Sequence, residues 1–130
     1  MTKGRQVLLK GPRMEELLRS YFIKAGYYVA RGVPFIYEGF DVTDIDLWLY
    51  SRTSSVSREI TLVDAKNKKT PQAIERIFWV QGLRIATKAT NAVVATTEKR
   101  QEVKDFGRDL GIIVLDGTFL NKLEKADGYN

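Results

Sequence analysis

Four charged side chains near the middle of the sequence have types and spacings that suit hydrolytic chemistry. Asp44 and Asp46 lie in the segment VTDIDLWLY, which alternates between polar and apolar residues like a half-buried strand, so both carboxylates share one face. Asp64 and Lys66 share a face of the next predicted strand, EITLVDAK, for the same reason. If a turn joins these strands into a hairpin, Asp46 lies close to Asp64, and the two carboxylates repel each other unless a cation lies between them. A divalent cation would relieve this repulsion and act as a Lewis acid, and a lysine beside it would polarise or deprotonate water.

The alternative interpretation is that these residues are charges at strand ends that face solvent. Against it, Asp64 and Lys66 follow the apolar run at residues 60–63 in what should be a central strand, where an unpaired charge is costly. Asp46 interrupts an apolar run in the same way. We therefore predict a functional site at these residues.

The composition restricts the chemistry that such a site can perform. The chain of 130 residues contains no cysteine and no histidine, which excludes disulfides, thiolate zinc sites, cysteine nucleophiles and mechanisms that depend on histidine. Any metal must be held by oxygen ligands, which favours Mg²⁺, Mn²⁺ or Ca²⁺. The formal net charge of +5 permits nucleic acid as a partner without requiring it.

The periodicity of apolar residues predicts a single domain with an α/β fold. Helices are expected over residues 13–25 (ended by Gly26), 71–88 (opened by Thr70-Pro71), 98–110 (ended by Gly111) and 119–125. Strands are expected over residues 27–31 (closed by Gly32-Val33-Pro34), 42–50, 59–66, 92–96 and 112–115, with a polar turn at residues 52–58. The strand at 42–50 should place Ile45, Leu47 and Leu49 on one face. This order predicts a mixed sheet with helices on both faces, whose last strands are parallel because helices separate them.

The sequence Asp46, then a hairpin, then Asp64-Ala65-Lys66 resembles the PD-(D/E)XK signature of the restriction-endonuclease-like nucleases. Ile45 stands where a proline usually precedes the first aspartate, a departure that many members share. The predicted order of elements also fits the αβββαβ core of that superfamily, over about residues 11–115. The resemblance implies a mixed central sheet flanked by helices, in one nuclease-like domain over residues 1–130 that could belong to a longer protein.

The first predicted helix and its flanks resemble the archaeal-type Holliday-junction resolvases and the Mrr-like nucleases. The resemblance rests on Gly11 with Glu15 four residues later, and on Gly26-Tyr27-Tyr28-Val29 after the helix. It implies that Glu15 is the acid that the helix carries to the site, whereas the alternative is an ordinary first-turn acid favoured by the helix dipole.

Gln81 interrupts the apolar face of the helix predicted at 71–88, where related nucleases often carry a glutamine. A buried polar side chain on such a face needs a partner. The alternative is a glutamine at the edge of the helix.

Together these resemblances imply metal-dependent hydrolysis of phosphodiester bonds in DNA. Asp46, Asp64 and the backbone carbonyl of Ala65 would bind Mg²⁺, with Mn²⁺ as a substitute, and Lys66 would orient or deprotonate the attacking water. Glu15 would help through water or a second ion, and Gln81 would contact a metal-bound water or the DNA.

Basic residues on both sides of the predicted site are candidates to bind DNA phosphates, namely Lys10, Arg13, Lys68, Lys69, Arg76 and Arg84. The alternative is a solvated helix face. For the whole chain, the alternatives to an endonuclease are a catalytically silent DNA-binding module on the same fold and an interaction domain of a larger assembly.

Cutting both strands of DNA would require a homodimer, an additional domain or a partner subunit. No stretch approaches 18 consecutive apolar residues and the first residues lack a signal-peptide core, so we expect a cytoplasmic protein with no membrane partner.

Overall fold

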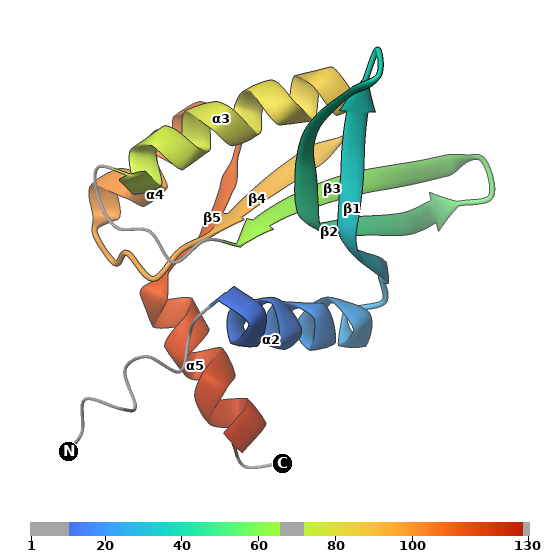
Figure 1. The fold of residues 1–130 in the computed structure, drawn as a ribbon. Helices are drawn as coiled ribbons and strands as arrows, with labels where there is room; N and C mark the ends of the chain where they lie inside the picture. Colours follow the sequence, from blue (N-terminus) through green and yellow to red (C-terminus); the bar gives the residue numbers. More distant parts are fainter. Residues whose placement is uncertain (1–10, 66–71, 129–130) are drawn as a thin grey trace.

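The computed structural model describes residues 11–65 and 72–128, and over these residues the chain forms a five-stranded sheet with four helices (Figure 1). In chain order the elements are α2 (Gly11–Lys24), β1 (Tyr28–Tyr37), β2 (Phe40–Ser54), β3 (Ser57–Ala65), α3 (Gln72–Thr87), β4 (Asn91–Ala95), α4 (Gln101–Asp109), β5 (Ile113–Leu115) and α5 (Gly117–Gly128). The strands lie in the order β1-β2-β3-β4-β5, with antiparallel pairing up to β3 and parallel pairing from β3 to β5. This confirms the predicted α/β fold with a mixed sheet, and the order αβββαβαβα resembles the PD-(D/E)XK core.

Helices cover both faces of the sheet, as predicted, with α3 and α4 on one face and α2 and α5 on the other (Figure 1). The core between the sheet and α3 and α4 includes Leu62, Ile77, Val80, Ala92, Val94 and Val103. The core on the α2 and α5 face includes Met14, Leu18, Leu47, Val63, Val93 and Leu120. Alternate residues of β3 and β4 enter the two cores, so these central strands read as continuous apolar runs.

Glycines end two helices where the sequence predicts. Gly26 has a φ of +103°, its N–H donates to the carbonyl of Ile23, and the N–H of Tyr27 donates to the carbonyl of Phe22. This pair of hydrogen bonds is the Schellman motif, which places a residue in the left-handed region at the helix end. Gly111, with a φ of +75°, ends α4 with the same pattern.

The predicted end of the first strand at Gly32-Val33-Pro34 is wrong, because β1 continues to Tyr37. Pro34 is tolerated because β1 is an edge strand, where the missing N–H removes no bond needed inside the sheet. The actual reversal is at Glu38 and Gly39, whose φ values of +50° and +83° fit a two-residue hairpin turn.

The second strand is also longer than predicted, and residues 52–58 are mostly strand rather than turn. Strands β2 and β3 pair out to Ser54 and Ser57, so the reversal is confined to two residues. The expectation that Ile45 shares a face with Leu47 and Leu49 is wrong as well, because Ile45 packs in the α3-side core and the other two in the α2-side core. The part of β2 that precedes Leu47 is not paired with β3 and bends with β1 toward α3, which interrupts the simple alternation (Figure 1).

The predicted opening of the second helix at Thr70-Pro71 lies outside the described residues, as does Lys66 at the expected end of the third strand. The last helix is longer than predicted and begins at an N-cap that the prediction missed, since Asp116 Oδ1 accepts the N–H of Phe119 at 3.0 Å. Across the described residues, none of the helices has the length and apolar character needed to span a membrane.

Candidate active site

Asp46 and Asp64 flank the point where β2 and β3 stop pairing. The last paired residues are Leu47 and Val63, and the same register extended by one residue sets Asp46 opposite Asp64. At this point a side chain replaces the backbone acceptor of the ladder, because Asp46 Oδ2 accepts the hydrogen bond from the N–H of Ala65 at 2.8 Å. The structure thus joins the Asp46 carboxylate to the residue that directly follows Asp64.

The geometry of Ala65 bears on its predicted role as a backbone ligand. In a strand the N–H and the C=O of one residue point toward the same neighbouring strand. Since the N–H of Ala65 meets Asp46 of β2, its carbonyl is directed to the β2 side too. The side chain of Ala65 is buried in the α2-side core, which fixes the strand at this position.

Asp64 is the most buried acidic side chain of the predicted set, with 5% of it exposed, and it is held by Arg76 of α3. Arg76 binds both carboxylate oxygens, since its Nε donates to Oδ2 at 3.1 Å and its second nitrogen donates to Oδ1. The guanidinium also lies over the ring of Trp79, with 4.2 Å from Cζ to the ring centroid. A bidentate pair of this kind is charge-assisted and directional. The structure therefore assigns Arg76 to an internal partner rather than to open solvent.

Glu15 does not join this group. It accepts a hydrogen bond from Arg31 Nε at 3.1 Å, and the neighbouring Glu16 accepts one from Arg31 at 3.1 Å. Arg31 is opposite Leu47 in the sheet and therefore lies on the α2 face, whereas Asp64 pairs with α3 on the other face. Over residues 11–65 and 72–128 no three acidic side chains come close enough together to hold a metal ion.

Gln81 has partners away from the two aspartates. Its Nε2 donates to the carbonyl of Leu110, just after α4, and its Oε1 accepts a hydrogen bond from Arg84. Arg84 in turn donates to the carbonyl of Ala89, before the start of β4, whereas Asp64 is paired with Val94 toward the other end of that strand. Gln81 thus links α3 to the end of α4.

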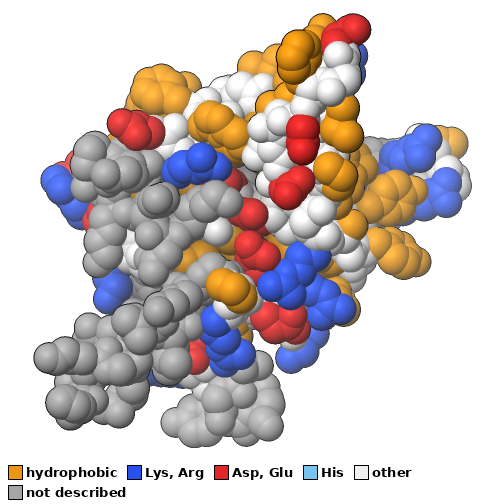
Figure 2. All heavy atoms as spheres, viewed as in Figure 1, with side chains coloured by type: hydrophobic (Ala, Val, Ile, Leu, Met, Phe, Trp, Pro, Cys, Tyr) orange, Lys and Arg blue, Asp and Glu red, His pale blue; other side chains and the backbone are white. Residues whose placement is uncertain are grey.

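The basic residues predicted to bind DNA divide into two groups. Lys10, Lys68 and Lys69 lie outside the described residues, as does the predicted catalytic Lys66. Arg13 pairs with Glu124 of α5 at 3.4 Å, Arg76 with Asp64, and Arg84 with uncharged oxygens. Acidic and basic side chains accordingly lie next to each other over the middle of the face in Figure 2, and neither sign forms a continuous patch there.

Sequence reasoning missed the roles of Arg31 and Asp116. Arg31 ties the start of α2 to β1 through two acids and the carbonyl of Pro12. Asp116, 7% exposed, follows β5, caps α5 and pairs with Lys104 Nζ at 3.5 Å. For Asp116 a signal was present, since an aspartate directly after an apolar strand and before a helix is a typical N-cap.

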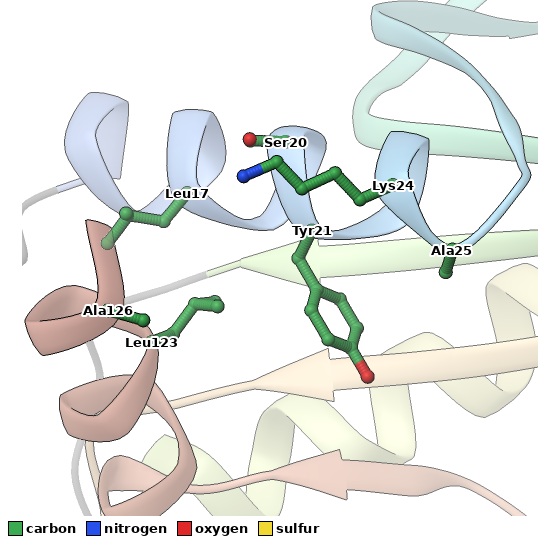
Figure 3. Close-up of a pocket in the computed structure, with 7 residues that line it drawn as sticks. All are labelled: Leu17, Ser20, Tyr21, Lys24, Ala25, Leu123 and Ala126. Carbon is green, nitrogen blue, oxygen red and sulfur yellow. The ribbon is translucent and has the colours of Figure 1, made fainter. Parts of the chain in front are cut away.

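Three cavities of the described residues lie apart from the aspartates. One of about 340 Å³ lies between α2 and α5, and its lining includes Tyr21 and Leu123 (Figure 3). Two others, of about 350 and 530 Å³, lie between α3 and the β1–β2 hairpin. None of these three is lined by an acidic residue, so they offer no metal ligands. The candidate site is instead the point between β2 and β3 where their pairing ends, at Asp46 and Asp64.

The comparisons with known proteins agree with the fold. The architecture is that of an α/β protein with a mixed sheet, resembling the restriction-endonuclease-like core. A solved structure described as a protein of unknown function, AF1548, is similar to this chain with a TM-score of 0.65 and 12% sequence identity. The match covers 88% of this chain and 65% of that chain, and at this identity it shows a shared fold alone. No protein-family model and no curated protein matches the sequence.

Proposed function

We propose that this protein is a metal-dependent endonuclease that hydrolyses phosphodiester bonds in DNA. The observation that carries the proposal is the convergence of Asp46 with Asp64 and Ala65 where β2 and β3 stop pairing, in a fold of the type on which this signature performs that reaction. A structure-specific role on branched DNA and a role in restriction or repair are the two forms of this activity that the sequence resemblance favours.

The donor atoms where β2 and β3 stop pairing suit a hard divalent cation. They are all oxygens, from two carboxylates and one carbonyl, and Mg²⁺ and Mn²⁺ prefer such ligands. Asp64 attracts positive charge, since a guanidinium binds both of its oxygens, and a divalent cation would have to compete with that guanidinium. Asp46, Asp64 and the Ala65 carbonyl are therefore the residues that would hold Mg²⁺.

The chain's own residues would divide the work of hydrolysis between them. A bound Mg²⁺ supplies Lewis acidity toward the phosphate and lowers the pKa of coordinated water. Asp46 stays in place through its bond to the Ala65 N–H, and Asp64 through burial and Arg76. Lys66, next in the sequence after Ala65, is proposed to orient or deprotonate the attacking water and to stabilise the charge that develops on the phosphate.

A catalytically silent DNA-binding module is the second candidate, favoured by the Arg76–Asp64 pair itself. An aspartate that is buried and bound at both oxygens by an arginine also serves as a purely structural ion pair. In that case the protein binds DNA, and divalent cations leave its binding and its stability unchanged.

Cleavage assays with matched aspartate variants distinguish the two candidates. Labelled supercoiled, single-stranded and four-way-junction DNA is incubated with the protein in Mg²⁺, Mn²⁺ or EDTA. Asp64→Asn is compared with Asp116→Asn, because Asp116 is similarly buried and also paired with a basic residue but caps α5. The proposal expects metal-dependent cleavage that Asp64→Asn abolishes and Asp116→Asn retains, and absence of cleavage in both metals with retained DNA binding would establish the silent module.

Two further parts of the proposal follow from the activity. Cutting both strands would use a homodimer, an additional domain or a partner subunit, which the sedimentation of the protein on junction DNA would test. With DNA as the substrate and no cysteine in the chain, we propose a cytoplasmic location.

A further inference from the structure

We propose that Arg76 is a positioning residue that holds Asp64 in the metal-free protein and competes directly with the divalent cation for its carboxylate. This inference rests on the proposed function, because it concerns the same metal site. It assigns to Arg76 a role in the metal-free protein, in addition to the phosphate contact expected from its position in the sequence.

The first argument is the use of both oxygens. Arg76 donates to Oδ1 and to Oδ2 of Asp64, so a cation that coordinates either oxygen would lie directly beside the positive charge of the guanidinium and be repelled by it. Only 5% of the Asp64 side chain is exposed, so solvent contributes little to stabilising its charge. A cation that enters must therefore replace much of what the guanidinium supplies.

The second argument is that the guanidinium has a second contact, with Trp79, that would remain after Asp64 is released. Arg76 lies on α3, is 22% exposed, and stacks over Trp79, which is itself 39% exposed. A cation–π contact holds a guanidinium without using its N–H donors. Once released from Asp64, Arg76 would keep its contact with Trp79 and present its donors to an anion beside the metal, such as a DNA phosphate.

The third argument is that the contact is specific to this position on α3. Arg84, two turns later on the same helix, binds the side-chain oxygen of Gln81 and the carbonyl of Ala89, and it pairs with no carboxylate among residues 11–65 and 72–128. Its removal eliminates a charge of the same sign on the same element without affecting Asp64. Arg84→Gln is therefore the matched control for Arg76→Gln.

The test measures Mn²⁺ binding by electron paramagnetic resonance and by the change in tryptophan fluorescence, with no DNA present. We expect Arg76→Gln to bind Mn²⁺ roughly tenfold to a hundredfold more tightly than the wild type. In the wild type the metal must first break the buried ion pair between Arg76 and Asp64, whereas in the variant there is no such pair to break. Arg76→Lys, which keeps the charge but not the fork, should lie between them. Arg84→Gln should bind as the wild type does, and Asp64→Asn should lose the binding whichever residue stands at 76.

Stability supplies a second readout, in case Arg76→Gln weakens the fold. Without metal this variant leaves Asp64 without its arginine and should melt at a lower temperature than the wild type, and Mn²⁺ should raise its melting temperature by more than it raises that of the wild type. Arg76→Lys, the milder change, should show the same effect in smaller measure. Equal increments for all three proteins would refute competition.

The outcomes separate this inference from the proposed function. If Asp64→Asn abolishes Mn²⁺ binding but Arg76→Gln and the wild type bind equally, the metal site stands and the role of Arg76 is refuted. If the wild type and Arg76→Gln bind Mn²⁺ no better than Asp64→Asn does, the metal site itself fails, and the Arg76–Asp64 pair is purely structural.

Discussion

Replacing Asp46 in two ways separates its structural contribution from its proposed catalytic one. Asp46→Ala removes the acceptor of the Ala65 N–H, whereas Asp46→Asn retains a side-chain oxygen at that position and removes only the charge. The control is Asp44→Ala, because Asp44 is exposed and lies two residues earlier on the same strand.

The magnitude follows from the environment of the Ala65 N–H. Ala65 is 2% exposed and the pairing of β2 with β3 has ended at Leu47 and Val63, so Asp46 supplies the acceptor that a backbone carbonyl would otherwise provide. Leaving a buried donor unsatisfied costs about 1–3 kcal/mol. For a domain of this size we expect Asp46→Ala to lower the melting temperature by roughly 5–10 °C. Asp46→Asn should lower it by much less, and Asp44→Ala by almost nothing.

The measurements are thermal unfolding by circular dichroism in EDTA and DNA cleavage in Mg²⁺ well below the lowest melting temperature. Asp46→Asn should be nearly as stable as the wild type yet inactive, because an amide does not supply the negative charge that a divalent cation requires. The reasoning fails if the alanine and asparagine variants are equally destabilised. The assignment of Asp46 to the metal fails if Asp46→Asn cleaves DNA at the wild-type rate.

Three further predictions concern other parts of the molecule. Gly107→Ala should destabilise the protein by about 1–3 kcal/mol in urea unfolding, because a Cβ there would approach Val114 Cγ2 to 2.5 Å. Gly82→Ala, in a helix with open space around that position, should instead stabilise the protein by about 0.5–1 kcal/mol. A change of the same sign in both variants would contradict this packing. Gln81→Ala should lower the free energy of unfolding by about 1 kcal/mol, because the hydrogen bond to a backbone carbonyl is lost, and it should leave Mn²⁺ affinity unchanged. Weaker Mn²⁺ binding of this variant on titration would show that Gln81 contributes to the metal site. Addition of Mg²⁺ should raise the melting temperature of the wild type but not of Asp64→Asn, and an equal rise in calorimetry would mean that the cation binds elsewhere.

Much of the fold was predictable from the sequence because it depends on local patterns. The helix ends at Gly26 and Gly111 depend on one residue that adopts a positive φ, and the central strands depend on continuous apolar runs. One error arose because the rule that a proline ends a strand does not hold on an edge strand. Pro34 breaks most strands but not one whose outer side is unpaired, so β1 extends past it to Glu38 and Gly39.

The candidate site was predictable only in its acids. The pairing of Asp46 with the neighbourhood of Asp64 follows from two strands and a short turn, and the register of β2 and β3 places the two residues opposite each other. Arg76 is 12 residues from Asp64 on a separate helix, and Arg31 is 16 residues from Glu15, so both ion pairs depend on how helices dock on the sheet. Sequence patterns predict which face of a helix is buried, but not which residue pairs with each charge on that helix.

These arginine pairs change how the positive charge of the chain is to be interpreted. A net charge of +5 permits binding to DNA, yet Arg13, Arg76 and Arg84 each donate hydrogen bonds to acceptors within the protein. An arginine that must leave a buried carboxylate before it meets a phosphate contributes little to DNA affinity on its own. If a cation takes its place on Asp64, the same arginine becomes available, so metal and DNA would strengthen each other's binding by an equal factor. In this arrangement the pair that opposes metal binding is also what couples the metal to the substrate.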